Sequence, residues 1–157
     1  MAVRTDVETF YREHASAVLG FLVSLSRDRA LAEDLLQDTF IKATRSLGSY
    51  RGGSPRAWLF AIARSTFIDH TRRRRVDPVE EIDQTAPPDP DVAERLVIED
   101  VLSRLPERQR TALVLADQVG MPHAEVAETL GISPGASRVL IHRARSAFRK
   151  IYEEQNR

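Results

Sequence analysis

The sequence contains no cysteine and no long apolar segment, and its 157 residues carry no net charge. The absence of cysteine excludes a disulfide scaffold, a thiolate metal site and a cysteine nucleophile, and it is typical of a reducing cytoplasm. No apolar run approaches the roughly 18 residues that a membrane-spanning helix needs, and the first residues lack the apolar core of a signal peptide. We therefore expect a cytoplasmic protein with no membrane contact of its own.

The zero net charge conceals an uneven distribution of charge along the chain. Residues 1–75 carry 13 Lys and Arg against 8 Asp and Glu, residues 76–95 carry 1 against 7, and residues 96–157 carry 9 against 8. The middle segment also holds four prolines and few large apolar side chains, which is typical of an extended, solvated linker. We therefore predict two small domains, residues 1–75 and 96–157, joined by an acidic linker at 76–95.

The sequence also lacks the signals of β-structure, because it has neither period-2 alternation nor an Asn-Gly hairpin turn. Apolar residues instead recur at helical spacing in both domains. Asp28 and Ser54 are expected to cap two helices of the first domain, the second of which runs to Arg75. In the second domain we expect helices at 92–104, 106–118, 123–130 and 134–153. The predicted fold class is all-α.

Residues 123–150 have the pattern of a helix-turn-helix. Ala127 is small where two helices must cross closely, Gly131 permits a left-handed turn, and Ser133 is placed to cap the next helix. From 134 to 150 this next helix carries five basic residues and no acid. Its positive field suits DNA phosphates and guanine edges, although an arginine-rich solvated helix of an ordinary bundle would show the same composition.

Two segments of the first domain have patterns of their own. The acids of the amphipathic stretch Ala32–Ala43 indicate either a solvated face or a face that docks on a partner, and no histidine or further acid lies at metal-ligand spacing. Residues 50–75 mix aromatics and arginines beside Gly52 and Gly53, as single-stranded nucleic-acid sites do. Tyr50 is the better candidate to stack on a base, whereas Trp58 and Phe67 are expected in the core.

Together these segments resemble a bacterial sigma factor of the extracytoplasmic-function group (group IV), the two-domain kind. The resemblance lies in residues 10–14 for region 2.1, 32–40 for region 2.2, 54–75 for regions 2.3 and 2.4, 105–110 for region 4.1 and 124–145 for region 4.2. It implies a helical sigma2-like domain and a sigma4-like helix-turn-helix domain. It also implies a transcription initiation factor that is not an enzyme and uses no cofactor and no metal.

The resemblance implies a role for three groups of residues. One group would bind the clamp of the largest subunit of core RNA polymerase: Asp34, Gln37, Asp38 and Phe40. A second would bind the −10 element of promoter DNA: Tyr50, Arg51, Arg56, Arg64, Ser65 and Arg72. A third would bind the −35 element: Ser137, Arg138, His142, Arg143 and Arg145. Residues 105–115 would meet the flap of the second-largest subunit, and an anti-sigma factor is a further implied partner.

The recognition helix departs from the common pattern of the family. Ser137 stands at a usually apolar position, while Val139 and Leu140 replace polar residues. Two registers therefore remain open, one with Val139 and Leu140 toward thymine methyls and one with both packed inward. Ser65 also stands where an asparagine is common.

Two other classes of function are compatible with parts of the sequence. A conventional helix-turn-helix regulator with an N-terminal helical sensor domain would bind duplex DNA without polymerase, but it would not explain residues 32–43 or 50–75. A helical adaptor or nuclease is the other class. A nuclease would need convergent acids, or a nucleophile with its base, and the sequence offers neither.

Overall fold

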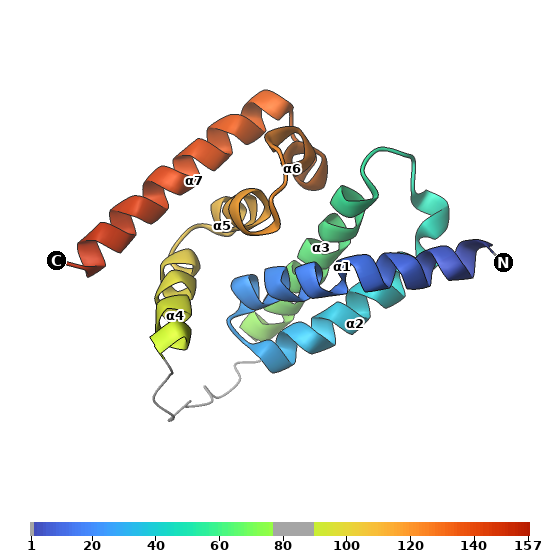
Figure 1. Cartoon of the computed structure of the whole chain (residues 1–157), viewed down its shortest axis with the longest axis horizontal. Coiled ribbons are helices and arrows are strands. Elements are labelled where there is room, and N and C mark those ends of the chain that lie inside the picture. The colour runs from blue at the N-terminus through green and yellow to red at the C-terminus, as the bar shows by residue number, and fades with distance from the viewer. Residues whose placement is uncertain (1, 77–89) are drawn as a thin grey trace.

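A computed structural model describes residues 2–76 and 90–157 (Figure 1). The first domain contains α1 (Ala2–Ser26), α2 (Arg29–Arg45), the short turn η1 (Leu47–Ser49) and α3 (Pro55–Val76). The second contains α4 (Pro90–Ser103), α5 (Glu107–Leu113), the π-helical turn η2 (Val114–Val119), α6 (His123–Leu130) and α7 (Pro134–Gln155). These described ranges contain no strand, so the predicted all-α class is confirmed.

The predicted helix caps are confirmed in atomic detail. The side chain of Asp28 accepts a hydrogen bond of 3.1 Å from the backbone N–H of Leu31. Ser54 and Ser133 accept equivalent bonds, also of 3.1 Å, from the N–H groups three residues further on. Each bond satisfies one of the backbone donors that the first turn of a helix leaves without a partner.

Two helix boundaries differ from expectation. The helix expected at 106–118 is α5 continued by the π-helical turn η2, and Gly120 ends it at a φ of 85°. Helix α4 begins at Pro90, inside the segment expected to be linker, because proline suits the first turn of a helix. Residues 77–89, the greater part of that predicted linker, lie outside the described residues, and the exact domain boundaries remain predictions.

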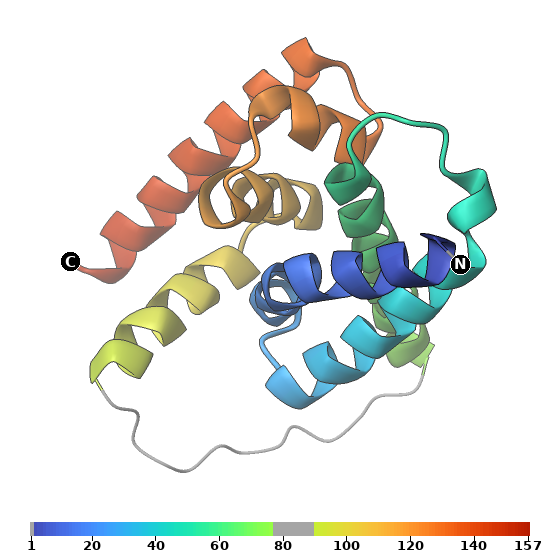
Figure 2. The same ribbon diagram turned by 45° about the vertical axis from the view of Figure 1, so that its right-hand side comes forward.

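The two domains pack against each other and share one apolar core. Phe21 of α1 and Phe60 of α3 meet edge to face at the centre of the first domain, with ring centroids 5.2 Å apart. The buried cluster continues into the second domain through Leu115 and Val126. In Figure 2 the helix α6 lies beside the loop that precedes α3, and η2 lies against α1. Domains of about 70 residues bury little surface alone, so this contact adds to the core of both.

In the described part of the chain, no helix is long and apolar enough to cross a membrane. Nor do three metal-ligating side chains converge among residues 8–74 and 92–157, whose side chains the structure describes.

Candidate polymerase and nucleic-acid surfaces

The acidic face of α2 is exposed, as its pattern suggested. Asp34, Gln37 and Asp38 all point to solvent, while Phe40 is only 8% exposed. The ring of Phe40 meets the ring of Tyr11 edge to face, with centroids 4.6 Å apart. The helix therefore offers two carboxylates and an amide to a partner, and Phe40 supports that face from below.

A shallow groove of about 480 Å³ runs beside this face, with Gln37 and Phe40 in its lining. Two large apolar side chains in its wall are exposed: Tyr11 at 44% and Ile41 at 48%. Neither residue was among those predicted from the sequence to bind polymerase. For Ile41 the sequence held a signal: it lies four residues after Gln37 on α2, so the two side chains share one face of the helix.

The loop before α3 has a defined shape. Gly52 and Gly53 adopt φ values of 97° and 82°, which residues with a side chain rarely reach. The hydroxyl of Tyr50 donates a 2.7 Å hydrogen bond to the carbonyl oxygen of Gly53, and its ring meets Trp58 edge to face at 5.7 Å. The Tyr50 ring is half-buried, so one side of it is held by the protein and part of it remains accessible.

Arg56, in the first turn of α3, is bound by an acid of the second domain. Its Nε donates to Glu125 Oε2 at 2.9 Å, and its Nη2 donates to Glu125 Oε1. The hydroxyl of Ser54 donates to the same Oε2 at 2.7 Å. The bond from Arg56 lowers the pKa of Glu125 and raises the pKa of Arg56, so both groups remain charged at neutral pH.

Arg64, two turns further along α3, makes a second pair of this kind. Its Nε and Nη2 donate to the two carboxylate oxygens of Glu107 in α5 at 2.8 and 2.9 Å. Burial alone would raise the pKa of Glu107, but the hydrogen bonds from Arg64 and Thr111 outweigh it and the pKa is lowered. The other basic or polar residues predicted to contact the −10 element are exposed: Arg51, Ser65 and Arg72.

The recognition helix α7 buries its Ser137, Ile141 and Ala144 face. Ser137 is fully buried, and its hydroxyl donates a 2.8 Å hydrogen bond to the carbonyl oxygen of His123 in α6. Val139 is 48% exposed, which selects the first of the two open registers for this residue, whereas Leu140 packs partly against the core. The structure therefore corrects one predicted DNA contact: the side chain of Ser137 faces the core and not the groove of DNA.

The other residues predicted for the −35 element lie on the outside of α7. Arg138, His142 and Arg143 are exposed, and Nη2 of Arg138 lies 3.3 Å from Nε2 of His123. Arg145 is exposed too, but its Nε and Nη2 contact the carboxylate of Asp117 at 3.1 and 2.5 Å. Arg138 and Arg143 thus have their guanidinium groups available for DNA, while Arg145 would first have to release Asp117.

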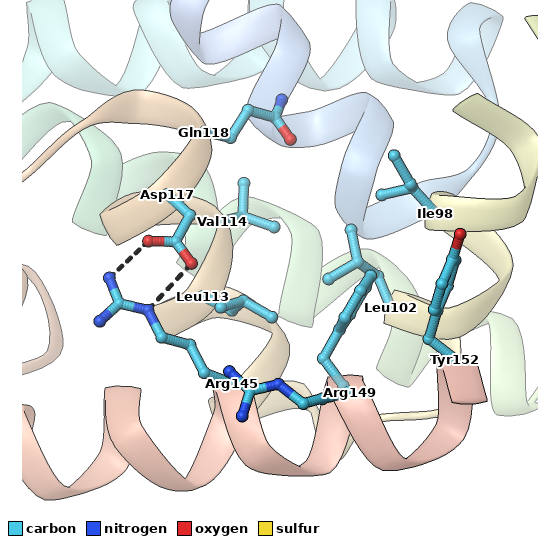
Figure 3. Close-up of a pocket in the computed structure, with 10 residues that line it drawn as sticks. Ile98, Leu102, Leu113, Val114, Asp117, Gln118, Arg145, Arg149 and Tyr152 are labelled. Carbon is cyan, nitrogen blue, oxygen red and sulfur yellow. Dashed lines mark hydrogen bonds and ion pairs between the residues drawn. The ribbon is translucent and has the colours of Figure 1, made fainter. Parts of the chain in front are cut away.

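A groove of about 660 Å³ separates α4 from α7 (Figure 3). Figure 3 shows the Asp117–Arg145 pair at one end and Tyr152 with Ile98 at the other. The walls between them are mostly apolar and include Leu102, Leu113, Val114 and Phe148. Within residues 105–115, Leu105 and Thr111–Leu115 are buried, whereas Pro106 and Arg108 are exposed. Leu113 and Val114 line this groove with the small part of their surface that remains accessible.

Comparison with known proteins gives the family of the chain. The Sigma-70 region 2 family matches residues 10–76, and the Sigma-70, region 4 family matches residues 95–148. The RNA polymerase sigma factor CarQ of Myxococcus xanthus is 37% identical over 155 residues, which cover 94% of this chain and 89% of that protein. The ECF RNA polymerase sigma factor SigM of Bacillus subtilis is 31% identical, with 93% of this chain and 94% of that protein covered.

The chain belongs to the extracytoplasmic-function sigma factors. These sigma factors are transcription initiation factors, so the resemblance inferred from residues 10–145 is confirmed. Two solved structures share the arrangement. One is RpoE of Bartonella quintana in complex with the anti-sigma factor NepR, with a TM-score of 0.74, 27% identity, and 94% of this chain and 97% of that chain covered. Another is CnrH in complex with the cytosolic domain of CnrY, with a TM-score of 0.78, 26% identity, and 96% and 90% covered.

Proposed function

We propose that this sigma factor binds core RNA polymerase, directs it to specific promoters through their −10 and −35 elements, and aids promoter opening. The observation that carries the proposal is the order of the two family regions along nearly the whole chain. The surfaces support it. The acidic face on α2 and the basic face on α7 lie in different domains, so one domain can bind polymerase while the other binds DNA. The chain acts without chemistry of its own, in the cytoplasm where the polymerase works.

The polymerase docks on α2. Asp34, Gln37 and Asp38 supply charge and hydrogen-bond complementarity to the clamp of the largest subunit. The exposed rings and aliphatic groups of Tyr11 and Ile41 supply the apolar contact that a stable interface needs at its centre. Phe40 belongs to this site as the residue that positions Tyr11.

The −10 element binds along the loop 50–53 and α3. The Tyr50 ring stacks on an unpaired base, while Arg51, Arg56 and Arg72 hold phosphates of the strand. Arg64 and Ser65 extend this surface along the helix. The −35 element binds across α7, where Arg138 reads a base and His142, Arg143 and Arg145 hold the backbone.

The groove between α4 and α7 is the site for the flap of the second-largest subunit. Leu113 and Val114 give it an apolar floor, and Arg149 lies at its rim. An anti-sigma factor inhibits this protein by covering the same polymerase-binding surfaces. While it is bound there, core polymerase cannot bind. The similar sigma factor RpoE, which is bound to the anti-sigma factor NepR, supports this partner class.

Comigration with core polymerase tests the function most simply. The purified chain, mixed with core enzyme that lacks any sigma factor, should elute with it in gel filtration at a one-to-one ratio. A conventional helix-turn-helix regulator would instead elute alone and would bind duplex DNA without polymerase. Separate elution at micromolar concentrations would contradict the proposal.

A further inference from the structure

Three glutamates of the second domain lie on the surface proposed for the −10 strand. Glu125 and Glu128 of α6 meet the start of α3, and Glu107 of α5 meets its middle. Two arginines of this surface, Arg56 and Arg64, are thereby occupied by carboxylates. Sequence separations of 69 and 43 residues make these contacts purely tertiary.

The carboxylates are held as a phosphate would be held. Glu125 accepts from the guanidinium fork of Arg56 and from the hydroxyl of Ser54, while Glu128 Oε2 accepts a 3.0 Å bond from the backbone N–H of Ser54. Helix starts and arginine forks are the donor groups that bind phosphate oxygens. Gly53 allows the close approach, since a Cβ there would lie 3.2 Å from Glu128 Oε2.

Several other single hydrogen bonds join the two domains, and water could replace each of them if the domains separated. Ser24 donates to Gln118 at 2.8 Å, Arg27 donates to Asp100 at 3.3 Å, and Arg110 donates to the carbonyl oxygen of Leu25 at 2.9 Å. With the pairs of Arg56 and Arg64, they form a polar rim around the shared apolar contact. Interfaces between two domains of one chain commonly open and close, and this rim is the polar part of the contact.

We propose that Glu125 and Glu128, assisted by Glu107, act as an intramolecular substitute for DNA phosphates, so that the packed arrangement of the two domains is a closed state in which the −10 surface is covered. The inference rests on the proposed function of that surface. The exposed −35 face of α7 is not covered in this state. The free protein therefore binds single strands poorly until the domains separate.

Neutralising the two acids should uncover the surface. The variant Glu125→Gln/Glu128→Gln keeps the shape of both side chains but removes their charge. The matched control is Glu153→Gln/Glu154→Gln, which makes the same charge change at exposed positions near the end of α7. The probe is a fluorescent single-stranded 12-nucleotide DNA of mixed sequence, with affinity measured by anisotropy over a range of salt concentrations.

The closed state predicts that Glu125→Gln/Glu128→Gln binds the strand about five-fold or more tightly than the control. The slope of log K against log salt should steepen by roughly 0.7 for each arginine that gains a phosphate. Adding Arg56→Ala to the double variant should remove the gain. Equal affinity in the double variant and its control would overturn the proposal, and so would a gain that survives Arg56→Ala.

A distance measurement keeps the test independent of DNA. Because the chain has no cysteine, Ser49→Cys and Lys150→Cys introduce two spin labels at exposed positions, one in each domain. Pulsed electron resonance should show one narrow distance in the parent and a longer population in Glu125→Gln/Glu128→Gln. A distribution that does not change with the two substitutions would contradict the closed state.

A separate assay distinguishes failure of the closed state from failure of the proposed function. Run-off transcription with core polymerase reports that function for the parent chain, whatever the single-stranded DNA assay shows. If the parent initiates transcription and the glutamine variant binds DNA no better than its control, the closed state fails alone. If the parent neither joins core polymerase nor initiates, the proposed function fails.

Discussion

Ser137 of α7 donates a 2.8 Å hydrogen bond to the backbone carbonyl oxygen of His123 in α6, and its side chain is completely buried. This contact joins the two helices of the helix-turn-helix at their crossing, and it places Arg138 and Val139 on the outside of α7. A serine is tolerated on an apolar face because its hydroxyl has a partner. The contact therefore determines which side chains of α7 can reach DNA.

Replacing Ser137 tests this reading of α7. Ser137→Ala should lower the free energy of unfolding by about 1 kcal/mol, because a buried carbonyl loses its donor. The sequence preference at the −35 element should not change. Urea unfolding and selection from a promoter library measure the two effects. A new −35 preference with unchanged stability would mean that Ser137 touches DNA.

Arg138 is expected to read a base. Arg138→Ala should relax the preference at a single −35 base pair, with a loss of about 1–3 kcal/mol there. Arg143→Ala is the matched comparison: it should weaken binding on all sequences alike and reduce the salt slope by about 0.9. Libraries selected with the two variants compare them directly, and identical −35 preferences for the parent and Arg138→Ala would reject Arg138 as a reader.

Tyr50 is expected to act in promoter opening. Tyr50→Ala should slow opening more than it weakens duplex binding, by roughly 1–3 kcal/mol if a base stacks on the ring. Tyr50→Phe is the control, because it keeps the ring and removes only the bond to the Gly53 carbonyl. Permanganate reactivity of the melted region follows the rate. An unchanged opening rate in Tyr50→Ala would exclude stacking.

Asp38 is expected to contribute to polymerase binding. Asp38→Arg should weaken binding to core enzyme without unfolding the domain, because a charge reversal at an exposed position mainly removes complementarity. Glu154→Arg makes the same reversal at the far end of α7 and should bind core enzyme like the parent. Titration of labelled core polymerase measures both. Equal affinities would remove Asp38 from the docking face, and Gln37→Ala tests its neighbour in the same way.

The contact between α3 and α6 should depend on pH. The bond from Arg56 lowers the pKa of Glu125 in the folded protein, so the stabilisation is complete above the ordinary pKa of glutamic acid, about 4.3, and is lost as the pH falls through the lowered pKa. His14 of α1 also faces this pair. Burial lowers the pKa of His14, so the folded protein resists its protonation. The stability that neutral His14 contributes is therefore also lost on acidification, starting at a higher pH than for Glu125.

Comparison of two proteins isolates the Glu125 contribution. The parent should lose more unfolding free energy than Glu125→Gln between pH 5 and pH 3, as followed by thermal unfolding at constant ionic strength. The His14 contribution is common to both proteins and cancels to first order. Parallel losses in the two would show that the Arg56–Glu125 pair does not stabilise the folded chain.

Local features of this protein were predictable from sequence, whereas contacts between its domains were not. The caps at Asp28, Ser54 and Ser133 follow from residue type and neighbouring periodicity, so reading the chain in order finds them. The pairing of Arg56 with Glu125 depends on how two domains meet, and no local pattern encodes it. The burial of Ser137 was missed because a polar residue in a helix predicts exposure unless its acceptor is known.

Run-off transcription on genomic fragments, with start sites mapped, tests most directly whether this chain directs core RNA polymerase to promoters. With the parent chain, core polymerase should initiate at a limited set of sites that share spaced −35 and −10 sequences, and Asp38→Arg should reduce that activity. Initiation no different from that of core enzyme alone would contradict the account.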